Sequence, residues 1–273
     1  MYQIYTVLKE KKYKIGKFNR FKIYEPKERE IVSFNMFDKV VNNLVSKYIL
    51  EKSLSKGLVD VNVASRKNKG ISKGLLYRYE YEKKLKHLKY YVLKCDISKF
   101  FNSIDINILK EKIKRKIKDK DALNILNEIL SCDKHLPIGL NTSQILAIFY
   151  LDDLDKYIKE KLKIKYYVRF QDDFLMFHSS KLYLQNCIKS LEVFLSLYML
   201  KLNKKTRIYN FNNNYMFLGR NKYGKYNNYR LINRKIKKRY KLYTLDKINV
   251  YGFIISCVCF DKLNSNIHKL VVN

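Results

Sequence analysis

The chain has 273 residues, and its 57 Lys and Arg against 25 Asp and Glu give a formal net charge of +32 at pH 7. A charge of this size points to a polyanionic partner, while 47% hydrophobic residues, with 24 Tyr and 15 Phe, exclude a wholly disordered basic tail. Five scattered Cys without a CxxC pair, and only four His, argue against a disulfide framework and a zinc site.

The compartment follows from the apolar segments. The opening residues, MYQIYTVLKEKKYK, lack the apolar core of a secretory signal. The longest apolar run, Val250–Phe260, contains Gly and Ser and is too short to span a bilayer. We therefore expect a soluble cytoplasmic protein with reduced thiols and no membrane partner.

The first half of the chain predicts helices followed by a strand. After a basic opening segment, apolar residues recur at helical spacing from about Phe37 to Leu54, and a second helix is predicted to end near Lys89. The run YYVLKCDI (90–97) is β-prone, and Asp105 can cap the helix that follows it. This part of the chain reads as strand, turn and helix.

The second half predicts a hairpin between helices. A helix over 122–132 precedes the loop HLPIGLNTSQ (135–144), after which helical periodicity resumes. The run YYVRFQDDFLMFHS (166–179) reads as strand, two carboxylates and strand, and a helix over 181–200 follows. Short strands are predicted in KLNKKTRIYNF (201–211) and NNYMFLGR (213–220). The order predicts an α+β fold with helices packed on one face of an antiparallel sheet.

Three carboxylates lie where predicted strands end. Asp96 closes one β-prone run, and Asp172 and Asp173 form the bend of another. Carboxylates at the ends of buried strands are costly unless a cation or hydrogen bonds neutralise them. If the strands pair, the three side chains form an oxygen cluster suited to Mg²⁺, and two such ions would support in-line phosphoryl transfer to a 3′-hydroxyl. The alternative is a solvated hairpin tip.

Seven ordered segments resemble the motifs of reverse transcriptases. The palm-like segments are KYYVLKCDISKFFNSID, LPIGLNTSQILAIFYLDDLD, YYVRFQDDFLMF, LKLNKKTRI and YMFLGR, and the finger-like segments are FKIYEPKEREIVSFNMFDKVV and ASRKNKGISKGL. The resemblance covers roughly residues 20–220 and implies a right-hand polymerase fold. The implied domains are fingers at 1–89, an RRM-like palm at 90–219 with finger-palm helices within 105–132, and a short basic helical thumb at 220–273.

The resemblance implies a role for each matching residue. Asp96, Asp172 and Asp173, with the backbone carbonyl of Ile97, would bind two Mg²⁺ ions, or Mn²⁺ as an alternative. Lys205 would stabilise or protonate the leaving pyrophosphate. The residues implied in nucleotide binding are Lys27, Arg29, Phe101, Ile138, Gly139 and Gln144, with Phe101 excluding a 2′-hydroxyl. Those implied in nucleic-acid binding are Arg66, Lys67, Arg234, Lys235, Lys237, Lys238 and Arg239.

The loop before Gln144 narrows the resemblance. Many reverse transcriptases have Gln before the Gly of this loop, whereas this chain has Ile138, and the pattern is most similar to enzymes of diversity-generating retroelements. This implies error-prone cDNA synthesis from dNTPs on an RNA template with a DNA or RNA primer, in a bacterial or phage setting. A small basic accessory protein is a further possible partner. The alternatives are a defence-associated anti-phage reverse transcriptase and a catalytically inactive RNA-binding palm.

Overall fold

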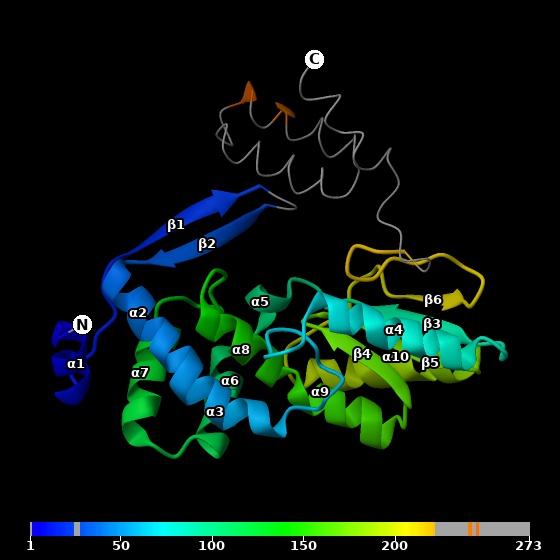
Figure 1. Cartoon of the computed structure of the whole chain (residues 1–273), viewed down its shortest axis with the longest axis horizontal. Helices are drawn as coiled ribbons and strands as arrows, with labels where there is room; N and C mark the ends of the chain where they lie inside the picture. Colours follow the sequence, from blue (N-terminus) through cyan, green and yellow to red (C-terminus); the bar gives the residue numbers. More distant parts are fainter. Residues whose placement is uncertain (1, 25–27, 222–239, 242–243, 246–273) are drawn as a thin grey trace. The chain divides into compact units, whose positions relative to one another are not determined.

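Four antiparallel strands form the larger sheet, in the order β4-β5-β3-β6 (Figure 1). Its strands are β3 (Tyr91–Cys95), β4 (Tyr166–Phe170), β5 (Asp173–His178) and β6 (Arg207–Asn210). β4 and β5 form the predicted hairpin, and β3 lies between β5 and β6. The sheet therefore joins three segments that are far apart in the sequence, as the strand pattern predicts.

The computed structural model describes residues 2–24, 28–221, 240–241 and 244–245. The chain divides into two units, one formed by residues 1–21 and 31–213 and the other by residues 22–30 and 214–273. The larger sheet belongs wholly to the first unit. The division into fingers, palm and thumb at residues 89 and 219 stays a prediction.

The two faces of the larger sheet differ in chemistry. Cys95 lies opposite Phe174, and both are fully buried on the face that packs against α10 (Lys181–Ser196). Side chains alternate along a strand, so Lys94 and its partner Leu175 point to the opposite face. On that face Val92 and Leu175 are fully buried, whereas the Lys94 side chain stays partly exposed and pairs with Asp173.

Helices make up most of the remaining described chain. The long helix predicted near residues 37–54 is confirmed, and it includes one π-helical stretch. Asp105 caps α6 (Ile106–Lys116), as predicted, because its side chain accepts hydrogen bonds from the backbone amides of Asn107 (2.8 Å) and Ile108 (2.9 Å). In chain order the elements are α1 (Tyr2–Lys9), α2 (Met36–Leu44), η1 (Val45–Leu50), α3 (Glu51–Leu54), η2 (Ser55–Gly57), α4 (Ile71–Leu85), α5 (Phe100–Ser103), α6 (Ile106–Lys116), α7 (Lys120–Leu130), α8 (Asn141–Tyr150), α9 (Asp152–Lys156) and η3 (Tyr157–Lys161).

Two parts of the fold differ from the sequence prediction. The basic opening segment contains a two-stranded ladder, β1 (Phe18–Ile23) with β2 (Arg29–Phe34), that the sequence did not indicate. The strand predicted at 213–220 is wrong. There the chain forms an isolated bridge between Phe217 and Arg220, because Leu218 and Gly219 both have positive φ angles that turn the backbone.

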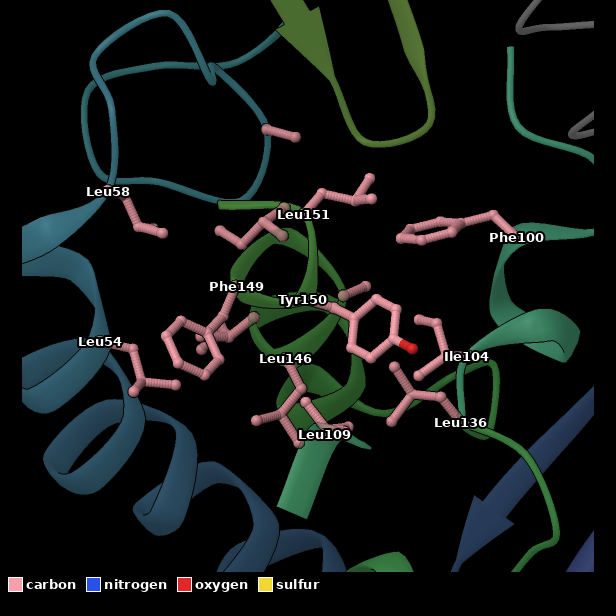
Figure 2. Close-up of a cluster of buried hydrophobic side chains, with 14 of the residues drawn as sticks. Leu54, Leu58, Phe100, Ile104, Leu109, Leu136, Leu146, Phe149, Tyr150 and Leu151 are labelled. Carbon is pink, nitrogen blue, oxygen red and sulfur yellow. The ribbon is translucent and has the colours of Figure 1, made fainter. Parts of the chain in front are cut away.

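The hydrophobic core of the first unit surrounds α8. Tyr150, Phe149 and Leu146 of this helix are buried against Leu54 and Leu109, which come from α3 and α6 (Figure 2). Aromatic side chains bury large apolar areas, so this contact is a main source of stability. It also fixes the loop that precedes α8. None of the helices in the described part of the chain is long and apolar enough to cross a membrane.

Candidate active site

The carboxyl groups of Asp96 and Asp172 meet at one edge of the larger sheet. β3 runs antiparallel to β5, with Cys95 opposite Phe174. Asp96 follows the last residue of β3, and Asp172 lies in the turn directly before β5. The two side chains lie close enough for the charge of Asp96 to raise the pKa of Asp172. Strand pairing thus brings together two carboxyl groups that are far apart in the sequence.

Asn203 holds Asp96 in place by two contacts. Its side-chain amide Nδ2 donates to Oδ2 of Asp96 at 2.8 Å, and its backbone N–H donates to the Asp96 carbonyl at 2.7 Å. The segment around Asn203 runs beside the end of β3 through an isolated bridge between Ile97 and Leu202. One oxygen of the Asp96 carboxylate is therefore fixed by a neutral donor.

Burial and like charge act together on Asp172. Burial, and after it the nearby negative charge of Asp96, raise the pKa of this carboxyl group to about 6. Two carboxylates in contact cannot both be charged cheaply without a cation. Such a pair favours either a shared proton or a bound metal ion.

Asp173 has a different partner. The ammonium of Lys94 donates to both of its carboxylate oxygens, at 3.0 and 3.1 Å. Burial raises the pKa of Asp173, and the charge of Lys94 opposes that rise. Asp173, the third carboxylate of the predicted triad, is therefore neutralised by a lysine from the adjacent strand.

The donor set of Asp96 and Asp172 fits a divalent cation. Mg²⁺ is commonly bound by one or two protein carboxylates, with water and substrate phosphates completing its octahedral shell. Among the described residues, no group of three or more His, Cys, Asp or Glu side chains is placed to share a metal ion. The third carboxylate, and the Ile97 carbonyl, stay predicted ligands.

Phe101 and Ile97 lie directly after β3. Ile97 is fully buried, and the hydrogen bonds around it are made by the Asp96 carbonyl and the Ser98 amide on either side. Phe101 is partly buried and meets the ring of Phe100 edge to face, with centroids 5.6 Å apart. Phe100 is fully part of the core, and Phe101 packs against the core while staying partly exposed; its role at the sugar stays a prediction.

The loop before α8 is fixed against β2. The backbone N–H of Val32 donates to the Ile138 carbonyl at 2.9 Å. Gly139 has a φ of +113°, and a Cβ at this position would lie 2.8 Å from both the Val32 carbonyl oxygen and Ile31 Cγ2. Only glycine fits this conformation and this close approach. The Ile138 side chain is partly buried.

A chain of side-chain hydrogen bonds links this loop to the turn between β4 and β5, which holds Gln171 and Asp172. Gln171 Nε2 donates to Ser65 Oγ at 3.1 Å, and Ser65 Oγ donates to Gln144 Oε1 at 3.3 Å. Gln144 belongs to α8, Ser65 to the loop that precedes α4, and Gln171 to the turn before Asp172. The predicted nucleotide-binding Gln144 is thereby placed near the carboxylates.

Arg66 and Lys67 line an open pocket of about 450 Å³. Arg66 Nη1 donates to the carbonyls of Val59 (2.9 Å) and Asn62 (3.2 Å), so part of its guanidinium braces its own loop. Lys67 is exposed. The remaining lining residues are Lys47, Tyr48, Glu51, Lys52, Ser55, Ser65 and Lys69. Five cations against one carboxylate make this pocket strongly basic.

The structure gives less information about the other predicted basic residues. Lys205 is exposed, and its backbone N–H donates to Asn203 Oδ1 at 3.0 Å, which puts it two residues beyond the partner of Asp96. Arg29 is exposed on β2, within the second unit. The remaining predicted basic residues lie outside the described residues: Lys27, Arg234, Lys235, Lys237, Lys238 and Arg239.

Sequence reasoning missed three residues that shape this site. Asn203 carried no signal, because it is one of many Asn residues. Lys94 and Arg169 did carry one, since each is a charged residue inside an otherwise apolar predicted strand. Such a residue either stays partly exposed beside an acidic partner, as Lys94 does, or has a fully buried partner, as Arg169 does.

These features define a polymerase-type palm, and the chain belongs to the reverse transcriptase (RNA-dependent DNA polymerase) family. The model of this family matches residues 15–221, which confirms the predicted right-hand polymerase fold. The family match does not distinguish diversity-generating enzymes from other members of the family. No curated protein matches the chain.

Solved telomerase structures share the fold. Telomerase from Candida albicans, in complex with a fragment of telomeric RNA, superposes with a TM-score of 0.61 at 14% identity, covering 96% of this chain and 56% of the telomerase chain. The corresponding complex from Candida tropicalis gives 0.56 at 14% identity, covering 94% and 55%. The apo, C-terminally truncated Candida tropicalis enzyme gives 0.54 at 18%, covering 76% and 52%. The chain thus spans about half the length of these telomerase chains.

Proposed function

We propose that this chain is an active RNA-directed DNA polymerase that adds dNTPs to a primer 3′-hydroxyl. The observation that carries the proposal is the pairing of β3 with β5, with Cys95 opposite Phe174, which places Asp96 and Asp172 close together at one edge of the sheet. A protein that only bound RNA would gain nothing from two adjacent carboxylates, because they repel the phosphate backbone. This argument disfavours the alternative of an inactive RNA-binding palm.

Each residue of the site has a proposed task. Asp96, fixed by Asn203, and Asp172 would hold Mg²⁺ or Mn²⁺. When bound, the two ions lower the pKa of the attacking hydroxyl and neutralise charge on the triphosphate. Asp173 keeps its charge compensated by Lys94. Lys205 would donate a proton to the departing pyrophosphate, and Phe101 would exclude ribonucleotides.

The basic pocket supports the nucleic-acid part of the proposal. Tyr48 is exposed at its rim, and the ammonium groups of Lys47 and Lys52 each lie 5.4 Å from its ring centroid. Basic side chains beside an exposed aromatic ring are the usual means of binding single-stranded nucleic acid. Ser65 lines this pocket and contacts Gln171, next to Asp172. An RNA template strand entering the site is its proposed occupant.

The finer proposal is error-prone cDNA synthesis in a diversity-generating retroelement, with a small basic accessory protein. Ile138 supports it, because an apolar side chain at this position cannot hydrogen-bond to an incoming nucleotide. Leu140 departs from the resemblance to diversity-generating enzymes, which implies Asn directly after the Gly, so a defence-associated enzyme is the second candidate. A template repeat and a variable repeat that differ at adenines in the neighbouring DNA would decide for the first.

Primer extension tests the proposed activity. The purified chain, an RNA template with an annealed DNA primer, dNTPs and Mg²⁺ or Mn²⁺ should give extended primer. Asp172→Asn should abolish extension while RNA affinity stays unchanged or rises slightly, because one negative charge near phosphate is removed. A wild-type chain that binds RNA tightly but extends no primer with either ion would instead identify a binding module.

A further inference from the structure

Arg169 is a charged side chain with no part in the chemistry proposed above, yet it is fully buried. It is the largest completely buried side chain of the described residues, and its carboxylate partner Asp155 is equally inaccessible. A buried ion pair is seldom more stable than a well-packed apolar pair of similar volume. The pair therefore calls for a role other than stability.

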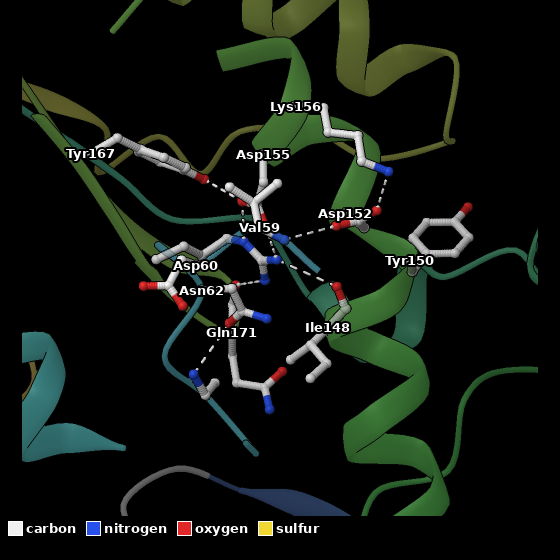
Figure 3. A network of polar contacts seen from close by, with 12 residues as sticks. Val59, Asp60, Asn62, Ile148, Tyr150, Asp152, Asp155, Lys156, Tyr167 and Gln171 are labelled. Atoms are coloured by element: carbon white, nitrogen blue, oxygen red, sulfur yellow. Dashed lines mark hydrogen bonds and ion pairs between the residues drawn. The ribbon is translucent and has the colours of Figure 1, made fainter. Parts of the chain in front are cut away.

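The guanidinium of Arg169 contacts three separate elements. Figure 3 labels its partners Asp155, Ile148 and Gln171. Nε donates to Asp155 Oδ1 at 2.7 Å, and Nη2 donates to Asp155 Oδ2 on α9. Nη2 also donates to the Ile148 carbonyl of α8 at 3.3 Å. Nη1 donates to the Gln171 carbonyl at 3.0 Å. Arg169 thus joins α8, α9 and the turn between β4 and β5.

The contact with Gln171 falls on a strained part of the backbone. Gln171 has a φ of +54°, a left-handed conformation that is strained for a residue with a side chain unless its surroundings hold it. Its carbonyl belongs to the same planar peptide group as the amide of Asp172. A donor fixed on this carbonyl therefore fixes the direction in which the chain enters Asp172.

We propose that Arg169, held by Asp155, is a positioning residue that orients the peptide group between Gln171 and Asp172 and so brings the Asp172 carboxylate to Asp96. This inference rests on the proposed metal site. Arginine suits the task because its planar fork has donors in several fixed directions, whereas the single nitrogen of a lysine cannot reach Asp155, Ile148 and Gln171 at once.

Metal binding by the full chain without nucleic acid tests the proposal. Free Mn²⁺ is measured by electron paramagnetic resonance during titration, for the wild type, Arg169→Lys and Tyr167→Phe. Tyr167 is a matched control, because its hydroxyl donates to the same Asp155 carboxylate at 2.7 Å and lies in the same buried cluster. We expect Mn²⁺ affinity to fall about tenfold in Arg169→Lys and less than twofold in Tyr167→Phe.

A second-site change separates positioning from general destabilisation. Glycine adopts positive φ without strain, so Gln171→Gly in the Arg169→Lys background should recover part of the lost Mn²⁺ affinity. It should not recover the melting temperature lost with the buried ion pair. Equal losses of affinity in Arg169→Lys and Tyr167→Phe, or wild-type affinity in Arg169→Lys, would overturn the proposal.

Two further variants cover the remaining outcomes. If Arg169→Lys does not fold, the double variant Arg169→Met/Asp155→Leu removes both buried charges together and should still bind Mn²⁺ weakly; wild-type affinity there would contradict the proposal. Asp172→Asn tests the metal site itself. If Asp172→Asn leaves Mn²⁺ binding unchanged, the proposed function fails. If Asp172→Asn loses Mn²⁺ binding but the Arg169 variants keep wild-type affinity, only the role of Arg169 is refuted.

Discussion

Lys94 neutralises Asp173 through both of its carboxylate oxygens, at 3.0 and 3.1 Å. The two consecutive aspartates of the hairpin are therefore not equivalent: Asp172 faces another carboxylate, and Asp173 faces a cation. Their replacement should have different consequences.

Asp173→Asn should retain a measurable rate of single-nucleotide incorporation, reduced about 10- to 100-fold, while Asp172→Asn should have none. Adding Lys94→Met to Asp173→Asn should change the rate little further, since the lysine has already lost its partner. Rates from rapid-quench experiments at saturating dNTP test this. Complete inactivity of Asp173→Asn in a folded protein would instead indicate a direct metal ligand.

The raised pKa of Asp172 predicts a pH-dependent response to metal. Without metal, the folded chain holds a proton up to about pH 6 that the unfolded chain releases near pH 4, so stability should fall as the pH rises through that window. Mg²⁺ competes with this proton. Added Mg²⁺ should raise the melting temperature by about 5 °C at pH 8 and not at pH 5. Asp172→Asn should show no Mg²⁺ response at either pH.

Gly139→Ala should destabilise the fold by about 3 kcal/mol or more, through positive φ together with the close approach to β2. Gly70→Ala is the matched control, because Gly70 has a φ of +121° but nothing within 4 Å of an added Cβ. Its cost should be about 1 kcal/mol, the strain alone. Urea unfolding measures both, and equal costs would mean that β2 yields to the methyl group.

Ile138→Gln should lower misincorporation, most visibly opposite template adenine. A restored neutral hydrogen bond is worth about 0.5–1.5 kcal/mol, which is roughly a two- to tenfold change in discrimination. Ile138→Leu, which keeps an apolar side chain, should leave the error spectrum unchanged. Sequenced extension products at matched activity test both variants. Identical spectra for Ile138→Gln and the wild type would show that Ile138 only packs.

The basic pocket predicts a preference for single strands. Lys47→Gln/Lys52→Gln should weaken binding of a duplex with a 5′ template overhang and reduce the slope of its salt dependence by roughly 1.4. Binding of the blunt duplex should change little. Lys181→Gln/Lys189→Gln, which removes two exposed charges from α10, controls for net charge. Equal losses on both duplexes would place the pocket on the double-stranded path.

The palm could be predicted because its signals are local. Asp96 directly follows one short apolar run, Asp172 and Asp173 lie between two others, and Asp105 is followed at once by helical periodicity. Pairing of β3 with β5 then brings Asp96 and Asp172 together. In contrast, β1 shows mostly exposed residues, FNRFKI, and gains its order by pairing with β2, which no short window of sequence reveals.

The contacts that refine the site are long-range, which is why sequence reasoning missed them. Asn203 reaches Asp96 from 107 residues away, and Val32 reaches Ile138 across a similar separation. Arg169 and Asp155 are 14 residues apart, but a loop and a turn of helix must close before they meet. An isolated charge in an apolar run indicates that a partner exists without indicating which residue it is.

The segment Val61–Val63 has a consequence for self-association. Arg169 accepts a hydrogen bond from the Val63 amide at 2.9 Å and donates one to the Val61 carbonyl at 3.0 Å, so part of the outer edge of β4 is already occupied. The opposite edge strand, β6, has only four residues and begins with an exposed Arg207. Unpaired, flat strand edges are the usual templates for domain swapping and fibre growth. Here a loop pairs with part of one edge of the sheet, and the other edge strand is short and begins with a charge. Both features oppose pairing of this sheet with the sheet of a second copy of the chain.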